Sequence, residues 1–150
     1  MALTEQIQSD LTAAMKARDV DTVGTLRMVM AAVKNARVAT GQQGDVTDEQ
    51  TLELLTREAK KRTEAAEAYD AAGRAELAAK ERRELAVIQR YLPEQLDEGT
   101  LRGIVHDAVA QTGASAPSDL GRVMSVVMPK VKGRADGKVV NALVRERLSG

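Results

Sequence analysis

Apolar residues recur at every third or fourth position through almost the whole chain, which is the period of an amphipathic helix. Over the first 92 residues this pattern predicts four helices. The first covers residues 5–18 behind Thr4 as N-cap, and the second runs from an Asp21 cap to about residue 38. The third begins at Thr47 and Gln50, which have the spacing of a capping box, and the fourth ends before Pro93.

Shorter elements are predicted after Pro93. Asp97 can cap a helix that ends near Gly113, an apolar stripe follows from residue 120 to Pro129, and Asp136 can cap a last helix. No segment alternates with the two-residue period of a strand. The sequence therefore predicts an all-α protein: a helical N-terminal subdomain of four helices with a long hairpin (1–92), then a small three-helix C-terminal subdomain (96–150), with YLPEQL as the joint.

Composition excludes several kinds of site. The chain has 150 residues, 43% of them hydrophobic, with no Phe, no Trp, no Cys and one histidine, His106. Disulfides, thiolate nucleophiles, cysteine zinc sites and multi-histidine metal centres are therefore excluded, and we expect no cofactor and no resident metal. The N-terminus has an acid at Glu5 and no apolar run, and no stretch is long enough to cross a bilayer, so we expect a cytoplasmic protein without a membrane contact.

Charge is distributed unevenly although the formal net charge is zero. The last thirty residues contain seven basic and two acidic residues, a net charge of +5. Within them the string VKGRADGK combines cations with glycines, through which backbone amides can approach a ligand, and with the N-terminus of the following helix. These features predict phosphate contacts. The candidate nucleic-acid-binding residues are Arg122, Lys130, Lys132, Arg134 and Lys138.

A structural interpretation of the same string stays open: Gly133 and Gly137 would serve a tight turn, Asp136 would cap the helix, and the lysines would keep the loop solvated. Elsewhere, the best carboxylate constellation is spread along the predicted hairpin, but arginines interleave with it, which favours a solvated face over a catalytic or metal site. His106 has no evident nucleophile beside it and is expected at the surface. The carboxylates are Glu64, Glu67, Asp70, Glu81 and Glu84.

Three strings together resemble the GatB/YqeY family, specifically its stand-alone YqeY-like members. The strings are RDVDTVGTLRMVMAAVKNA, KKRTEAAEAYDAAGRAELAAKERRELAVIQRYLPEQL and LGRVMSVVMPKVKGRADGKVVNALVRERL. Leu120 and Arg122 depart from the family's MGKVM pattern but conserve bulk and charge. The resemblance implies two helical subdomains, and a relation to the C-terminal helical region of the GatB component of the glutamine-dependent aspartyl/glutamyl-tRNA amidotransferase. In that component this region binds the tRNA body, and the catalytic domain lies elsewhere.

These observations favour a non-catalytic accessory protein that associates with tRNA or a tRNA-charging complex. No catalytic residues are assigned, because the chain has neither a phosphate loop nor an amidase-like nucleophile region. One alternative is a protein-interaction module that uses the helices of residues 48–92. Another is a carbon-nitrogen ligase activity with glutamine as amido donor, which only the family resemblance suggests.

Overall fold

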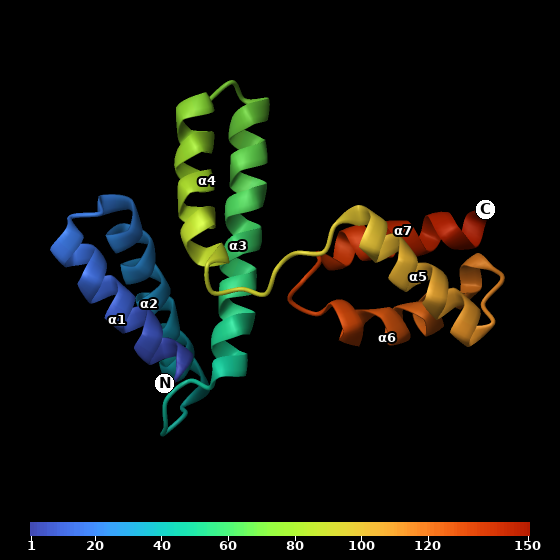
Figure 1. Cartoon of the computed structure of the whole chain (residues 1–150), viewed down its shortest axis with the longest axis horizontal. Coiled ribbons are helices and arrows are strands. Elements are labelled where there is room, and N and C mark those ends of the chain that lie inside the picture. The colour runs from blue at the N-terminus through green and yellow to red at the C-terminus, as the bar shows by residue number, and fades with distance from the viewer. The chain divides into compact units, whose positions relative to one another are not determined.

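The computed structural model describes residues 1–150 and contains helices but no strand. The N-terminal half holds α1 (Leu3–Ala17), α2 (Val20–Thr40), α3 (Asp48–Ala71) and α4 (Ala75–Gln89). The C-terminal half holds α5 (Glu98–Thr112), a short 3₁₀ helix η1 (Pro117–Asp119), α6 (Leu120–Val131) and α7 (Gly137–Ser149). The predicted all-α fold is confirmed. The chain divides into two compact units, Met1–Leu92 and Pro93–Gly150 (Figure 1).

Side-chain caps set several helix starts. Thr47 Oγ1 accepts a hydrogen bond from Gln50 N at 3.1 Å, and Gln50 Oε1 accepts one from Thr47 N at 2.9 Å, so the predicted capping box is confirmed. Two other predicted caps are wrong. Thr4 lies inside α1, whose N-cap is Ala2, and α2 is capped by Asp19 rather than Asp21.

The N-terminal unit packs one aliphatic core between all four of its helices. The fully buried side chains include Ile7, Leu26, Val29, Leu55 and Ile88. α3 and α4 form the predicted hairpin and lie side by side in Figure 1. Near the hairpin's turn only alanines are buried between the two helices, so the two backbones pack closely there without large side chains.

The core of the C-terminal unit is rich in valine. Val105 of α5, Val123 and Val127 of α6, and Val140 and Val144 of α7 are each at most 2% exposed. Compact β-branched side chains let three short helices approach without aromatic residues. Pro129 lies within the last turn of α6, which continues to Val131. None of the helices combines the length and the apolar character that a bilayer crossing requires.

Candidate nucleic-acid interface

The candidate interface is the loop between α6 and α7, here called the 132–136 loop. Lys132 follows the last residue of α6, and Gly133 has a φ of +76°, a left-handed conformation that favours glycine. Arg134 N then donates to Val131 O at 2.8 Å, which closes the turn. Asp136 caps α7 by accepting from Lys138 N at 2.9 Å, as its position in the sequence predicted.

The segment that leads into the C-terminal unit holds this loop in place. Leu96 N donates to Arg134 O at 2.8 Å, and Gln95 Nε2 donates to Gly133 O at 3.1 Å. In return, Arg134 Nε donates to Glu94 O at 3.2 Å. Arg134 is therefore an anchor of the loop through one of its five donors, and it is only half exposed.

The structure gathers four of the five candidate cations. Lys130, Lys132 and Lys138 are exposed in the last turn of α6, at its end and in the first turn of α7, with Arg134 between them. Arg122 does not join them. It lies eight residues before Lys130 on α6, about 12 Å along the helix axis, and it pairs with Asp119 at 3.0 Å.

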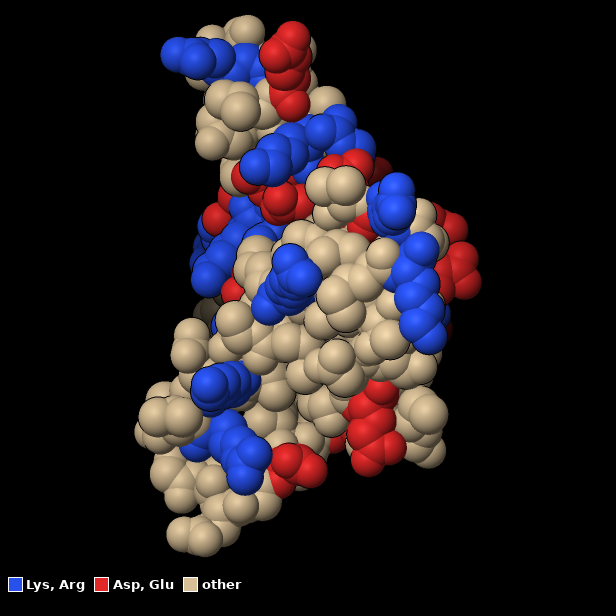
Figure 2. Space-filling view, turned by 90° about the vertical axis from the view of Figure 1, so that its left-hand side faces the viewer, with Lys and Arg blue, Asp and Glu red and all other residues tan.

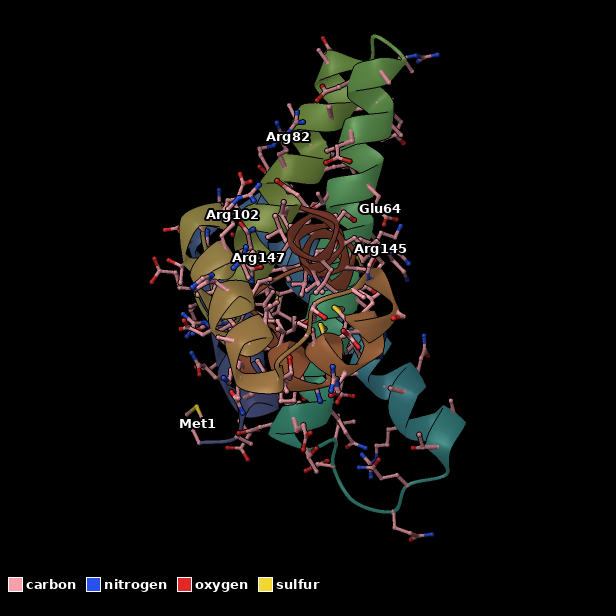
Figure 3. The ribbon with its side chains drawn as sticks, turned by 90° about the vertical axis from the view of Figure 1, so that its right-hand side faces the viewer. Met1, Glu64, Arg82, Arg102, Arg145 and Arg147 are labelled. Atoms are coloured by element: carbon pink, nitrogen blue, oxygen red, sulfur yellow. The ribbon has the colours of Figure 1, made fainter.

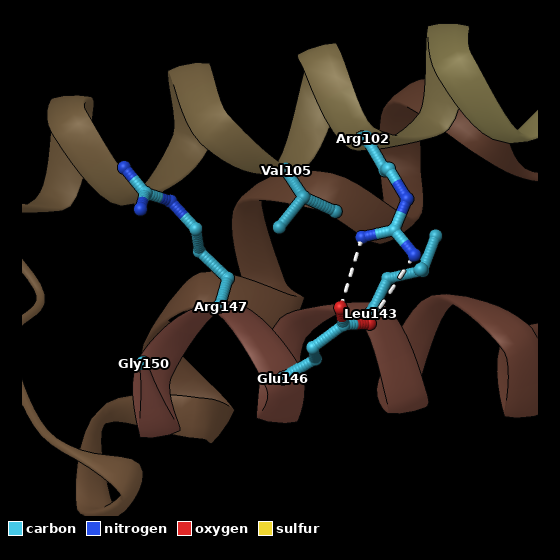
Figure 4. A pocket seen from close by; sticks show the side chains of 6 residues that line it. All are labelled: Arg102, Val105, Leu143, Glu146, Arg147 and Gly150. Carbon is cyan, nitrogen blue, oxygen red and sulfur yellow. Dashed lines mark hydrogen bonds and ion pairs between the residues drawn. The ribbon is translucent and has the colours of Figure 1, made fainter.

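A second basic region, which the sequence did not single out, lies between α5 and α7. Arg102 and Arg147 line a pocket of about 320 Å³, to which Val105 and Leu143 also contribute (Figure 4). Arg102 is paired with Glu98 at 2.7 Å and with Glu146 at 3.3 Å, so its charge is compensated. The pocket therefore attracts anions less than its arginines suggest.

His106 is exposed, as predicted, and its Nδ1 lies 2.9 Å from Arg147 Nη2. The two residues are 41 positions apart in the sequence, so no local pattern could reveal the contact. Arg145 points to the opposite side of α7 from Arg147 (Figure 3) and bonds Asn141 Oδ1 at 2.7 Å.

Arginines of the hairpin engage several of its carboxylates. Asp70 bonds Arg82 across the α3–α4 turn, and this hydrogen bond lowers the pKa of Asp70 below its ordinary value. Glu84 lies 3.4 Å from Arg62, which is 8% exposed and also pairs with Glu58. No group of three or more acidic or histidine side chains in the structure has an arrangement that could hold a metal ion.

Comparison with known proteins places this architecture in a family. The family model described as "Yqey-like protein" matches residues 4–148. The chain belongs to the YqeY-like family. It is also similar to "Altered inheritance of mitochondria protein 41, mitochondrial" of Pyrenophora tritici-repentis (strain Pt-1C-BFP), with 28% identity over 144 residues, which cover 94% of this chain and 78% of that relative. The family resemblance inferred from the sequence is thus confirmed over nearly the whole chain.

Proposed function

We propose that this protein is a non-catalytic accessory factor that docks on folded tRNA, or on a complex that charges tRNA, through the 132–136 loop and the lysines beside it. The observation that carries the proposal is the cluster of Lys130, Lys132 and Lys138 around an anchored loop at the start of α7. Phosphate groups suit the positive charge of the three lysines, which lie beside the N-terminus of α7, where Asp136 already caps the amide of Lys138. The family's relation to a tRNA-binding tail supports the same ligand.

The composition favours a folded RNA over a single strand. Single-strand binders stack bases on aromatic side chains, and this chain has only two tyrosines and no Phe or Trp. Both tyrosines, Tyr69 and Tyr91, belong to the N-terminal unit. The loop can therefore contact backbone phosphates and read the shape of an RNA, but it has no platform for bases.

A titration of a tRNA transcript by fluorescence anisotropy at several salt concentrations tests the proposal. In the loop variant, Lys130, Lys132 and Lys138 are each changed to Gln, while the anchoring Arg134 is kept. If the three lysines each contact a phosphate, the magnitude of the slope of log affinity against log salt falls by about 2–3. The control variant removes the same charge from exposed positions of α3: Arg57→Gln, Lys60→Gln and Lys61→Gln.

No tRNA binding at low salt, or equal losses in the loop and control variants, would contradict the proposal. Release of ammonia from glutamine by the purified chain would contradict its non-catalytic part and favour the carbon-nitrogen ligase alternative.

The hairpin supports a second candidate function, a protein-interaction module. Towards its turn, α3 and α4 bury only Ala66 and Ala78 against each other, and Leu77 remains 39% exposed. Because only small side chains are buried between the two helices there, the exposed Leu77 is available to contact a partner protein. Removal of RNA by nuclease before co-purification separates the two functions: a protein that stays bound, and is lost in Leu77→Glu, supports the module.

A further inference from the structure

The N-terminal unit has a cationic face of its own on α2. Between Thr22 and Thr40 this helix contains no Asp or Glu, and its only charged residues are Arg27, Lys34 and Arg37, all exposed. Figure 2 looks onto α1 and α2 and shows basic groups spaced over a largely uncharged surface, with acidic groups among them and towards its edges. We call the exposed side of α2 that carries these three residues the α2 face.

The three cations keep much of their charge uncompensated. Arg27 Nη2 contacts the sulfur of Met15 at 3.5 Å, which is a neutral acceptor. Lys34 lies at the edge of a groove of about 510 Å³ that runs between α1 and α2. Arg37 pairs with Asp45 at 3.5 Å, but both side chains are exposed, so water screens this pair.

Among the other acids near α2, Glu5 lines the same groove as Lys34 and Arg37, whereas three more have partners of their own. Asp10 accepts a hydrogen bond from Tyr91 Oη at 2.6 Å, and Asp19 accepts two from Thr22 at the helix start. Asp21 pairs with Arg83 of α4 at 3.3 Å. Each of these three carboxylates thus has a partner other than Arg27 or Lys34.

We propose that the α2 face is a second contact surface for RNA, which binds the phosphate backbone of a helical segment. Arg27 and Lys34 are about 10 Å apart along the helix axis, and Lys34 and Arg37 about 4.5 Å, so the three can meet phosphates along a groove edge. Gly24 and Ala31, also exposed on this helix, let a backbone approach closely.

Two other partners fit this face less well. A membrane surface is bound by helices that insert Trp, Phe or Leu, and the large exposed apolar residues of α2 are Val20 and Val38, one at each end. An acidic protein needs an apolar centre between the charged contacts, where the exposed side of α2 has Gly24 and Ala31. A uniformly anionic backbone needs neither feature.

The inference rests on the proposed function, since it names the same ligand for a different surface. Because the α2 face and the 132–136 loop belong to two units of one chain, simultaneous contact would make the second binding event intramolecular. The affinity for a tRNA would then exceed that for a short RNA duplex that only one surface can engage at a time.

The experiment uses the full chain and the same tRNA titration. The α2 variant carries Arg27→Gln, Lys34→Gln and Arg37→Gln, and the charge-matched control is again the α3 triple variant. We expect the α2 variant to lower the magnitude of the salt slope by about 2–3, and the control to leave it within about 0.5 of the unchanged protein. Thermal unfolding followed by tyrosine fluorescence checks that the N-terminal unit stays folded in each variant.

Equal behaviour of the α2 and control variants would overturn the inference. So would competition by polyglutamate as effective as that by an RNA duplex of equal charge, because an acidic protein would then be the better partner. The two proposals fail differently. If only the loop variant loses binding, the proposed function stands and the inference falls; if only the α2 variant does, the α2 face binds RNA and the loop is not the interface.

Discussion

The hydrogen bond between Tyr91 and Asp10 offers a direct measure of what holds the N-terminal unit together. Tyr91 follows α4, Asp10 lies in the middle of α1, and Tyr91 Oη donates to Asp10 Oδ2 at 2.6 Å across 81 residues of sequence. A hydrogen bond to a charged acceptor contributes about 1.5–3 kcal/mol. Since both side chains are only half-buried, we expect Tyr91→Phe to cost about 1–2 kcal/mol.

The chain's composition supplies the assay. Its two tyrosines, Tyr69 and Tyr91, are its only aromatic residues, so tyrosine fluorescence reports on the N-terminal unit alone. In Tyr91→Phe the remaining Tyr69 is the probe, and each kcal/mol lost should lower the unfolding midpoint of a unit of this size by about 4–8 °C. A double-mutant cycle with Asp10→Ala isolates the bond, because the two single effects should depart from additivity if the side chains interact.

The same bond predicts a dependence on pH. Burial of the phenol, followed by its hydrogen bond to Asp10, raises the pKa of Tyr91 above its ordinary value. The stabilisation is therefore complete below the unfolded pKa of about 10 and is lost as the pH rises towards the folded pKa. The unchanged protein should lose more stability than Tyr91→Phe between about pH 9 and about pH 11. Single effects that add within about 0.3–0.5 kcal/mol, or identical alkaline profiles, would refute this reasoning.

Three other changes test the structure. Arg62→Ala leaves the half-buried Glu84 without its cation and Glu58 with only the longer pair to Lys61 at 3.5 Å, which should cost up to about 3–5 kcal/mol in urea unfolding, less to the extent that water reaches the two glutamates. Gly133→Ala meets no atom within 4 Å but must keep a φ of +76°, so we expect a loss of about 1–2 kcal/mol, whereas Gly103→Ala inside α5 should stabilise the same unit. Hydrogen bonds from the start of α5 lower the pKa of Asp97. The stabilisation by its carboxylate is therefore present above about pH 4 and is lost as the pH falls through the folded pKa. In Asp97→Asn, acid unfolding followed by circular dichroism should depend less on pH.

The elements that local rules govern were predictable from the sequence. The capping box of Thr47 and Gln50 and the caps at Asp97 and Asp136 all form as predicted, because each depends on residues two or three positions apart. The start of α2 was misjudged for a local reason too. Arg18 adopts a left-handed φ of 57° after α1, which is uncommon for a residue other than glycine, and this places Asp19 rather than Asp21 at the cap.

Contacts between distant segments were not predictable. The sequence suggested Arg134 as a phosphate contact, but its bond to Glu94 O spans 40 residues, and nothing in the string VKGRADGK indicates it. In the same way, Arg147 beside His106 depends on how α7 packs on α5. Such contacts arise from tertiary packing, which periodicity and capping rules do not describe.

In the structure Arg134 anchors the loop that carries the candidate interface. Its Nε donates a hydrogen bond to Glu94 O, in the segment before α5. Gln95 of the same segment donates to Gly133 O in the loop. A loop held at both its carbonyls and its guanidinium presents the neighbouring lysines from a fixed backbone, which reduces the ordering that binding would otherwise require. Substitution of the lysines therefore tests binding with the Arg134 anchor kept, whereas substitution of Arg134 would also remove a contact that holds the loop.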